Sequence, residues 1–218
     1  MHTHTCASPE TLPPLLPASA AIFLCMQVLT LSSDGALVFE EIFMFSHRQH
    51  LPYAKFVTLQ TQTGLNISAT PGHYIWIIND TLEKSGASMP SLVLKRAGDI
   101  AIGDRLAQIT AFRLAVEPAH VVNIVVSFQQ GLYNPHTASG TIVVNSLAAT
   151  TFTDFLPPYT HMHALMTVPA RIMFSACKSI GGFALCERLN EALLHLYFRY
   201  PMGSMMAMIF AAAKNFGR

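Results

Sequence analysis

The stretch 68–77, SATPGHYIWI, places a hydroxyl group and an imidazole at the start of an apolar segment. Thr70 stands three residues before His73, and the Pro71-Gly72 pair between them predicts a tight turn. Such a turn can hold two side chains near one peptide group, where the imidazole protonates an amide nitrogen and the hydroxyl orients it. Thr-x-x-His is also common by chance, so a packed or solvated histidine is the alternative interpretation.

Outward from this stretch, residues 26–152 follow a β pattern. Short runs rich in Val, Ile, Phe and Thr alternate with Asp-Gly, Gly-Asp and Asn-Pro turn signals. Because no helical pattern separates these runs, the chain is predicted to form a compact all-β body. The phrases AGDI and IGDR, close together at 97–100 and 102–105, predict one hairpin. The runs expected to be strands are 36–45, 55–64, 73–80, 120–128 and 140–148.

The character of the sequence changes after residue 152, where apolar positions recur at helical spacing. We therefore expect an irregular segment over 1–25, a β domain over 26–152 and a helical, apolar extension over 153–218. The extension is rich in methionine, which suits a membrane surface, or a cap that packs against the β body. The helical repeat is formed by Leu185, Leu189, Leu193, Leu196 and Tyr200.

Composition argues against several classes of function. The 13 basic and 12 acidic residues nearly cancel, and no basic block supports nucleic-acid binding. The four cysteines form no Cys-x-x-Cys pair, and the His-x-His phrases at 2–4 and 161–163 lack further ligands at a suitable spacing. We expect no metal and no cofactor. Cys177 and Cys186 are expected to be buried, with a disulfide between them as an open alternative.

Four segments in a fixed order carry a family resemblance, with TPGH and GTIVVNSLAA as the most specific phrases. The sequence resembles the C-terminal autoprocessing domain of Hedgehog proteins, the Hint module shared with inteins. The resemblance implies a horseshoe-like β fold and self-cleavage from an upstream polypeptide. A cysteine that opens the module makes a thioester, which a sterol, water or another small nucleophile then resolves. The segments are 38–50, 56–77, 96–106 and 131–152.

The resemblance also assigns roles to individual residues. Thr70 and His73 match the pair that activates the scissile amide. His47 stands where Hedgehog proteins have the aspartate that acts as the second-step base, and an imidazole can serve as a base near neutral pH. A solvated residue at a strand end is the alternative for His47. Thr151 occupies the place of a late cysteine of the module.

The opening block of the module has no counterpart in the sequence. The resemblance places its cysteine-aromatic pair at or before Met1, and neither Cys6 nor Cys25 has the right neighbours or spacing. Because the acyl shift starts from a thiolate, we expect self-cleavage to be impaired. The alternative function is a degenerate, non-catalytic Hint domain that serves as a lipid- or membrane-associated interaction module.

The compartment is only weakly indicated by the sequence. The family resemblance implies the secretory pathway or the extracellular space. Residues 15–31 are largely apolar, but no Lys or Arg precedes them, so the pattern of a signal peptide is incomplete.

Overall fold

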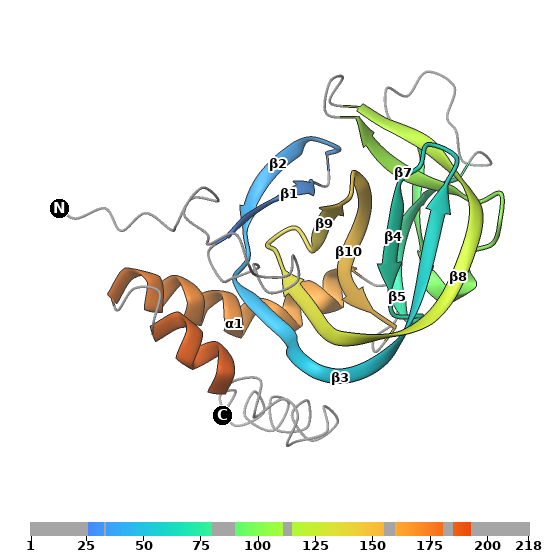
Figure 1. Cartoon of the computed structure of the whole chain (residues 1–218). Helices are drawn as coiled ribbons and strands as arrows, with labels where there is room; N and C mark the ends of the chain where they lie inside the picture. Colours follow the sequence, from blue (N-terminus) through green and yellow to red (C-terminus); the bar gives the residue numbers. More distant parts are fainter. Residues whose placement is uncertain are drawn as a thin grey trace, which may run out of the picture.

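The computed structural model of the chain is a curved body of β-strands with a helical part on one side (Figure 1). The strands are β1 (Gln27–Leu31), β2 (Leu37–Glu41), β3 (Met44–Thr61), β4 (Asn66–Ala69), β5 (His73–Ile78), β6 (Leu92–Arg96), β7 (Arg105–Thr110), β8 (Ala115–His136), β9 (Thr141–Val144) and β10 (Leu147–Thr153). The described residues are 26–32, 34–79, 90–110, 115–154, 160–180 and 185–192, with helix side chains from residue 167 onward.

All strand pairings among the described residues are antiparallel. A two-stranded sheet joins β1 to β2, and an eight-stranded sheet has the order β4-β3-β8-β7-β10-β5-β6, with β9 paired to β10. The prediction of an all-β fold of the Hint type with a helical C-terminal part is confirmed. The division of the chain into three parts stays a prediction.

The long pair β3 and β8 runs around one side of the molecule (Figure 1). Its register extends from Met44 opposite His136 to Thr61 opposite Val121. The register shifts at three places along this pair, and such bulges bend a strand and strengthen its twist. The curvature that the resemblance implied therefore has a local cause in the pairing of these two strands.

The main core is formed by side chains from strands that are distant in the sequence. Leu59 of β3, Ile75 of β5, Leu106 of β7 and Leu147 of β10 are fully buried and belong to one cluster. Burial of side chains of this size contributes about 2 kcal/mol each. Strand β5, which begins at His73, pairs with β6, β7 and β10, so it lies inside the sheet rather than at an edge.

Two sequence-based predictions of strands and turns were wrong. Residues 140–148 form a hairpin rather than one strand, because Asn145 and Ser146 adopt φ values of 49° and 62° and Val144 pairs with Leu147. A two-residue turn with both φ values positive matches the twist of the flanking strands.

The second wrong prediction was the hairpin at the two Gly-Asp phrases. Ala97–Asp99 forms the 3-10 helix η4, and the strands on either side pair elsewhere. Strand β6 pairs with β5, whereas β7 pairs with β8, β10 and β5. The chain between β6 and β7 is therefore a connection across the sheet.

The helical part packs against the beginning of β3. Helix α1 (Thr160–Ile180) and the helical residues 185–192 share a second apolar cluster with Phe43 and Phe45. Within the described residues, no helix is long and apolar enough to span a membrane. Of the predicted amphipathic repeat, Leu193, Leu196 and Tyr200 lie outside the described residues, as do Cys6 and Cys25.

Candidate active site

A tight turn brings Thr70 and His73 together between β4 and β5. The backbone N–H of His73 donates to the carbonyl oxygen of Thr70 at 2.9 Å, which closes a turn of four residues. Pro71 fixes one backbone angle of this turn and has no N–H to satisfy. Both Thr70 and His73 are half-buried. The turn therefore holds the two residues at one end of β5.

Backbone contacts from two other segments fix the middle of this turn. The N–H of Gly98 donates to the Pro71 carbonyl at 2.8 Å, and the N–H of Asp154 donates to the Gly72 carbonyl at 2.7 Å. A Cβ atom at Gly72 would lie 2.1 Å from Oδ1 of Asp154, so this position has room only for glycine unless the carboxylate moves. That carboxylate lies 3.5 Å from a guanidinium nitrogen of Arg96.

The orientation of the His73 ring is set by strand β10. Its Nε2 donates to the carbonyl oxygen of Thr150 at 2.7 Å. Thr150 is itself buried, and its hydroxyl donates to the carbonyl of Tyr74, one residue after His73. In a neutral imidazole one nitrogen carries the proton and the other the lone pair. The contact with Thr150 therefore leaves the lone pair of His73 on Nδ1.

Burial controls the protonation of His73. It lowers the pKa of the imidazole below its ordinary value of 6.5, and the hydrogen bond to Thr150 offsets only part of this effect. The ring is therefore neutral near neutral pH. A neutral imidazole with a free lone pair can accept a proton and pass it on, which is the task of a general acid and base.

His47 lies on a different part of the sheet. It occupies β3 opposite Asn134 of β8, and β3 pairs with β4 and β8 rather than with β5. The residue is half-buried, and burial lowers the pKa of its imidazole below 6.5. His47 is therefore neutral near neutral pH and can accept a proton.

The structure adds three residues to this site that the sequence interpretation missed. They are Gly98, Thr150 and Asp154, which contact the turn or the His73 ring through the hydrogen bonds given above. All three act through backbone groups in these hydrogen bonds, and any residue type can provide such groups. Their roles therefore leave no signal in a single sequence.

Thr151, in the place of the late cysteine, is buried. Its exposed fraction is 1%, and among the described residues its hydroxyl oxygen has no hydrogen-bond partner. A hydroxyl rather than a thiol stands there, so this position cannot form a disulfide.

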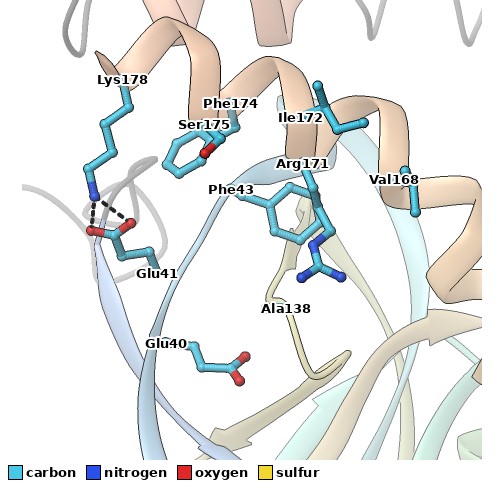
Figure 2. A pocket seen from close by; sticks show the side chains of 10 residues that line it. All are labelled: Glu40, Glu41, Phe43, Ala138, Val168, Arg171, Ile172, Phe174, Ser175 and Lys178. Atoms are coloured by element: carbon cyan, nitrogen blue, oxygen red, sulfur yellow. Dashed lines mark hydrogen bonds and ion pairs between the residues drawn. The ribbon is translucent and has the colours of Figure 1, made fainter.

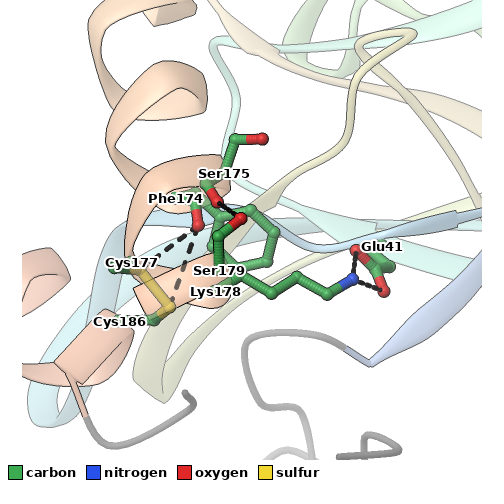
Figure 3. Close-up of a disulfide and its surroundings, with 7 residues drawn as sticks. All are labelled: Glu41, Phe174, Ser175, Cys177, Lys178, Ser179 and Cys186. Carbon is green, nitrogen blue, oxygen red and sulfur yellow. Dashed lines mark hydrogen bonds and ion pairs between the residues drawn. A yellow bond between two sulfur atoms is a disulfide. The ribbon is translucent and has the colours of Figure 1, made fainter. Parts of the chain in front are cut away.

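The two described cysteines are joined to each other. Cys177 at the end of α1 forms a disulfide with Cys186, and both are buried (Figure 3). This decides the open alternative of the sequence analysis in favour of a disulfide. Neither sulfur is a free thiol in this form of the protein.

No described residues form a cluster that could hold a metal. The structure contains no group of three or more His, Cys, Asp or Glu side chains at suitable distances within the described part of the chain. The His-x-His phrase at 2–4 and the side chains of 161–163 lie outside it. The expected absence of a metal and a cofactor stays a prediction.

Comparison with known proteins identifies the family. The model of the Hint module matches residues 24–200, most of the chain, so the chain belongs to the Hint family. Among curated proteins it is similar to Indian hedgehog B protein of Danio rerio, with 28% identity over 125 residues, 55% of this chain and 30% of that protein. Protein hedgehog of Drosophila virilis is 26% identical over 161 residues, 69% of this chain and 30% of the relative.

This chain spans about a third of the length of those relatives.

Solved structures with a similar fold include inteins. An intein from a hyperthermophile has a TM-score of 0.46 and 12% identity, covering 57% of this chain and 70% of that one. The DnaX mini intein of Spirulina platensis has a TM-score of 0.44 and 15% identity, covering 57% and 80%.

Proposed function

We propose that this chain is a self-processing domain that activates one peptide bond of its own upstream polypeptide. The observation that carries the proposal is the fixed His73 imidazole. Thr150 holds Nε2 at 2.7 Å, and burial keeps the ring neutral with its lone pair on Nδ1. Membership of the Hint family supports the same reaction class.

The first step is an acyl shift. A thiolate attacks the carbonyl carbon of the scissile peptide bond, and the carbon–nitrogen bond breaks to give a thioester. The proton lost by the thiol passes through Nδ1 of His73 to the leaving nitrogen, while the Thr70 hydroxyl orients the amide. General acid–base catalysis of this kind contributes about a hundredfold or more to the rate.

The second step transfers the acyl group to an acceptor. A sterol hydroxyl, another small nucleophile or water attacks the thioester carbonyl carbon, and His47 takes up the acceptor's proton. The carbon–sulfur bond breaks, and the proton passes from His47 to the departing sulfur. A neutral His47 suits this role, because only the neutral ring accepts a proton.

The thiol of the first step must come from outside the described residues. The described cysteines, Cys177 and Cys186, are joined in a disulfide. The expectation that the reaction is impaired, drawn from the neighbours of Cys6 and Cys25, stays a prediction. A disulfide that persists is typical of oxidising compartments, which supports a secretory location.

The test is cleavage of a precursor. This chain is expressed behind a passenger protein, joined through a segment that opens with cysteine and an aromatic residue, and treated with hydroxylamine or a thiol. We expect a released passenger whose rate of appearance falls about a hundredfold in His73→Ala. His50→Ala is the matched control, because His50 is an exposed histidine of β3. Equal release from wild type and His73→Ala would remove the proposed role of His73.

A second candidate function, a membrane-associated interaction module, is favoured by one groove. The groove between α1 and β2–β3 has a volume of about 570 Å³ (Figure 2). Its apolar lining includes Phe43, Val168 and Ile172, and two acidic and two basic side chains line it as well: Glu40, Glu41, Arg171 and Lys178. The Ile172 side chain is 65% exposed. Apolar side chains on an exposed helix face suit an interfacial contact with lipid.

Sedimentation with phosphatidylcholine vesicles tests this second function. We expect wild type to bind and Ile172→Glu to remain in solution. Ile102→Glu is the control, because Ile102 is equally exposed, at 67%, but lies outside the groove. Binding that is unchanged in Ile172→Glu rules out the groove as the contact surface.

A further inference from the structure

A second polar cluster lies at the start of β3, next to His47. The side-chain nitrogen of Asn134 donates to Oγ of Ser46 at 2.7 Å, and the same Oγ lies 2.9 Å from Nε2 of His136. Asn134 Nδ2 is 3.5 Å from His136 Nε2, which closes a triangle of three side chains. With His136 protonated on Nδ1, Nε2 accepts the proton of the Ser46 hydroxyl, and this is the tautomer that a base for Ser46 requires.

A β-bulge in the pairing of β3 with β8 falls at Ser46. Phe45 pairs with Pro135 and His47 pairs with Asn134, so Ser46 is an extra residue with no partner of its own on β8. Bulges redirect side chains and are common beside active sites. Met44 pairs with His136, so Ser46 shares a face of the sheet with His136 and Asn134, which brings the three side chains together.

The cluster is mostly buried but reaches the surface at Ser46. His136 and Asn134 are buried, with exposed fractions of 6% and 9%, whereas Ser46 is half-buried. The His136 ring lies between Phe43 and Phe152, with centroid distances of 6.4 and 6.1 Å. Apolar rings around an imidazole exclude water, while the reacting hydroxyl keeps access to the surface.

Strand β10 connects the cluster with the site of His73. Phe152, in contact with the His136 ring, stands two residues after Thr150, whose carbonyl holds the His73 ring. Strand β10 thus carries one neighbour of each imidazole. Ser46 and His73 lie on different parts of the sheet, and β10 is the strand that links them.

We propose that Ser46 is a nucleophile that accepts an acyl group from a thioester, with His136 as its base; the inference rests on the proposed function for its natural thioester. Oγ of Ser46 forms a bond to the thioester carbonyl carbon and gives its proton to Nε2 of His136. The carbon–sulfur bond breaks, and the proton passes to the departing sulfur. Water then hydrolyses the Ser46 ester to a carboxylic acid and restores the hydroxyl.

The experiment supplies the thioester from outside, so that no upstream polypeptide is needed. The full chain is incubated with the acetyl thioester of N-acetylcysteamine, and acetylated peptides are mapped by mass spectrometry. We expect acetylation of Ser46, its loss in Ser46→Ala, and a decrease of about a hundredfold in His136→Gln. Ser175→Ala is the control, because Ser175 is an exposed serine of α1.

Two results would overturn the inference. The first is a folded wild-type chain in which Ser46 remains free of acetyl groups while surface lysines react. The second is Ser46 acetylation that is equal in wild type and in a folded His136→Gln. If thermal unfolding shows that His136→Gln does not fold, the test rests on the other two proteins. The inference then requires that Ser46 is acetylated in wild type and that this acetylation is lost in Ser46→Ala. Precursor cleavage without Ser46 acetylation would refute this inference and leave the proposed function intact.

Discussion

The turn at Thr70–His73 and the start of β3 are stabilised by different kinds of contact, the first by backbone groups and the second by side chains. Backbone groups of Gly98 and Asp154 hold the turn. The start of β3, which carries Ser46 and His47, is held by side chains of the helical residues 185–192. Oδ1 of Asn190 accepts the N–H of Phe45 at 3.1 Å, and Glu187 forms an ion pair of 2.7 Å with Arg48.

This difference separates the two proposed steps of the reaction. Geometry built from backbone survives most changes of side chain, so the site of His73 should be robust. Geometry built from side chains depends on the element that provides them. The helical part is therefore more than a cover for the β body, because it positions the strand that carries His47.

The largest effect is expected from removal of the disulfide. Cys177→Ser with Cys186→Ser frees a short loop and should lower the free energy of unfolding by about 3 kcal/mol, measured by chemical denaturation. Amide exchange at Phe45 should rise, while amides of β5 stay protected. The double variant leaves the ion pair between Lys178 and Glu41, whose two contacts measure 2.5 and 2.7 Å (Figure 3). This pair is exposed, so it contributes little to the free energy of unfolding. An equal increase in amide exchange at Phe45 and in β5 would contradict the proposed difference between the two regions.

Removal of the Asn190 side chain should cost less. Asn190 is 2% exposed, and in Asn190→Ala the N–H of Phe45 loses its acceptor. A buried backbone donor left without a partner costs about 2 kcal/mol. Thermal unfolding should detect the change, with Glu191→Ala as a control at an exposed neighbour. No loss of stability in Asn190→Ala would mean that water or another group replaces the amide oxygen.

A substitution within the turn gives a still smaller effect. In Gly72→Ala the new methyl group displaces the carboxylate of Asp154 from its place beside Arg96. We expect a loss of about 1.5 kcal/mol, as for modest overpacking. Asp154→Ala should make the same substitution nearly neutral, because the clash is then absent. If the two changes are additive in denaturation experiments, Asp154 does not occupy this position.

The mildest effect is expected from pH, because a change of pH removes no contact. The pKa of His73 is below 6.5 in the folded chain, so the unfolded chain takes up a proton first as the pH falls. Stability should therefore decrease as the pH falls through the ordinary histidine pKa of 6.5 and be constant well above it. His73→Gln should reduce this slope, and the remaining slope should come in part from His47, whose pKa burial also lowers. An unchanged slope in His73→Gln would show that other groups cause the decrease.

Local signals in the sequence predicted some of this fold well. The Pro-Gly pair and the apolar run after His73 correctly indicated a turn and a strand at 73–78. No local signal indicates Asp154 at the turn, because that contact joins segments far apart in the chain. The hairpin at Asn145-Ser146 was missed because the run of apolar residues on both sides of it looked continuous. The cluster of Ser46 and His136 depends on the register of β3 against β8, which joins segments about 90 residues apart and leaves no local signal in the sequence.

The most direct test of the central claim is the tautomer and pKa of the His73 imidazole, measured by NMR from its nitrogen chemical shifts. Our account predicts a neutral ring at pH 7 with the proton on Nε2, the lone pair on Nδ1, and a pKa below 6.5. A ring protonated on Nδ1 at that pH, or one that titrates above 6.5, would contradict it.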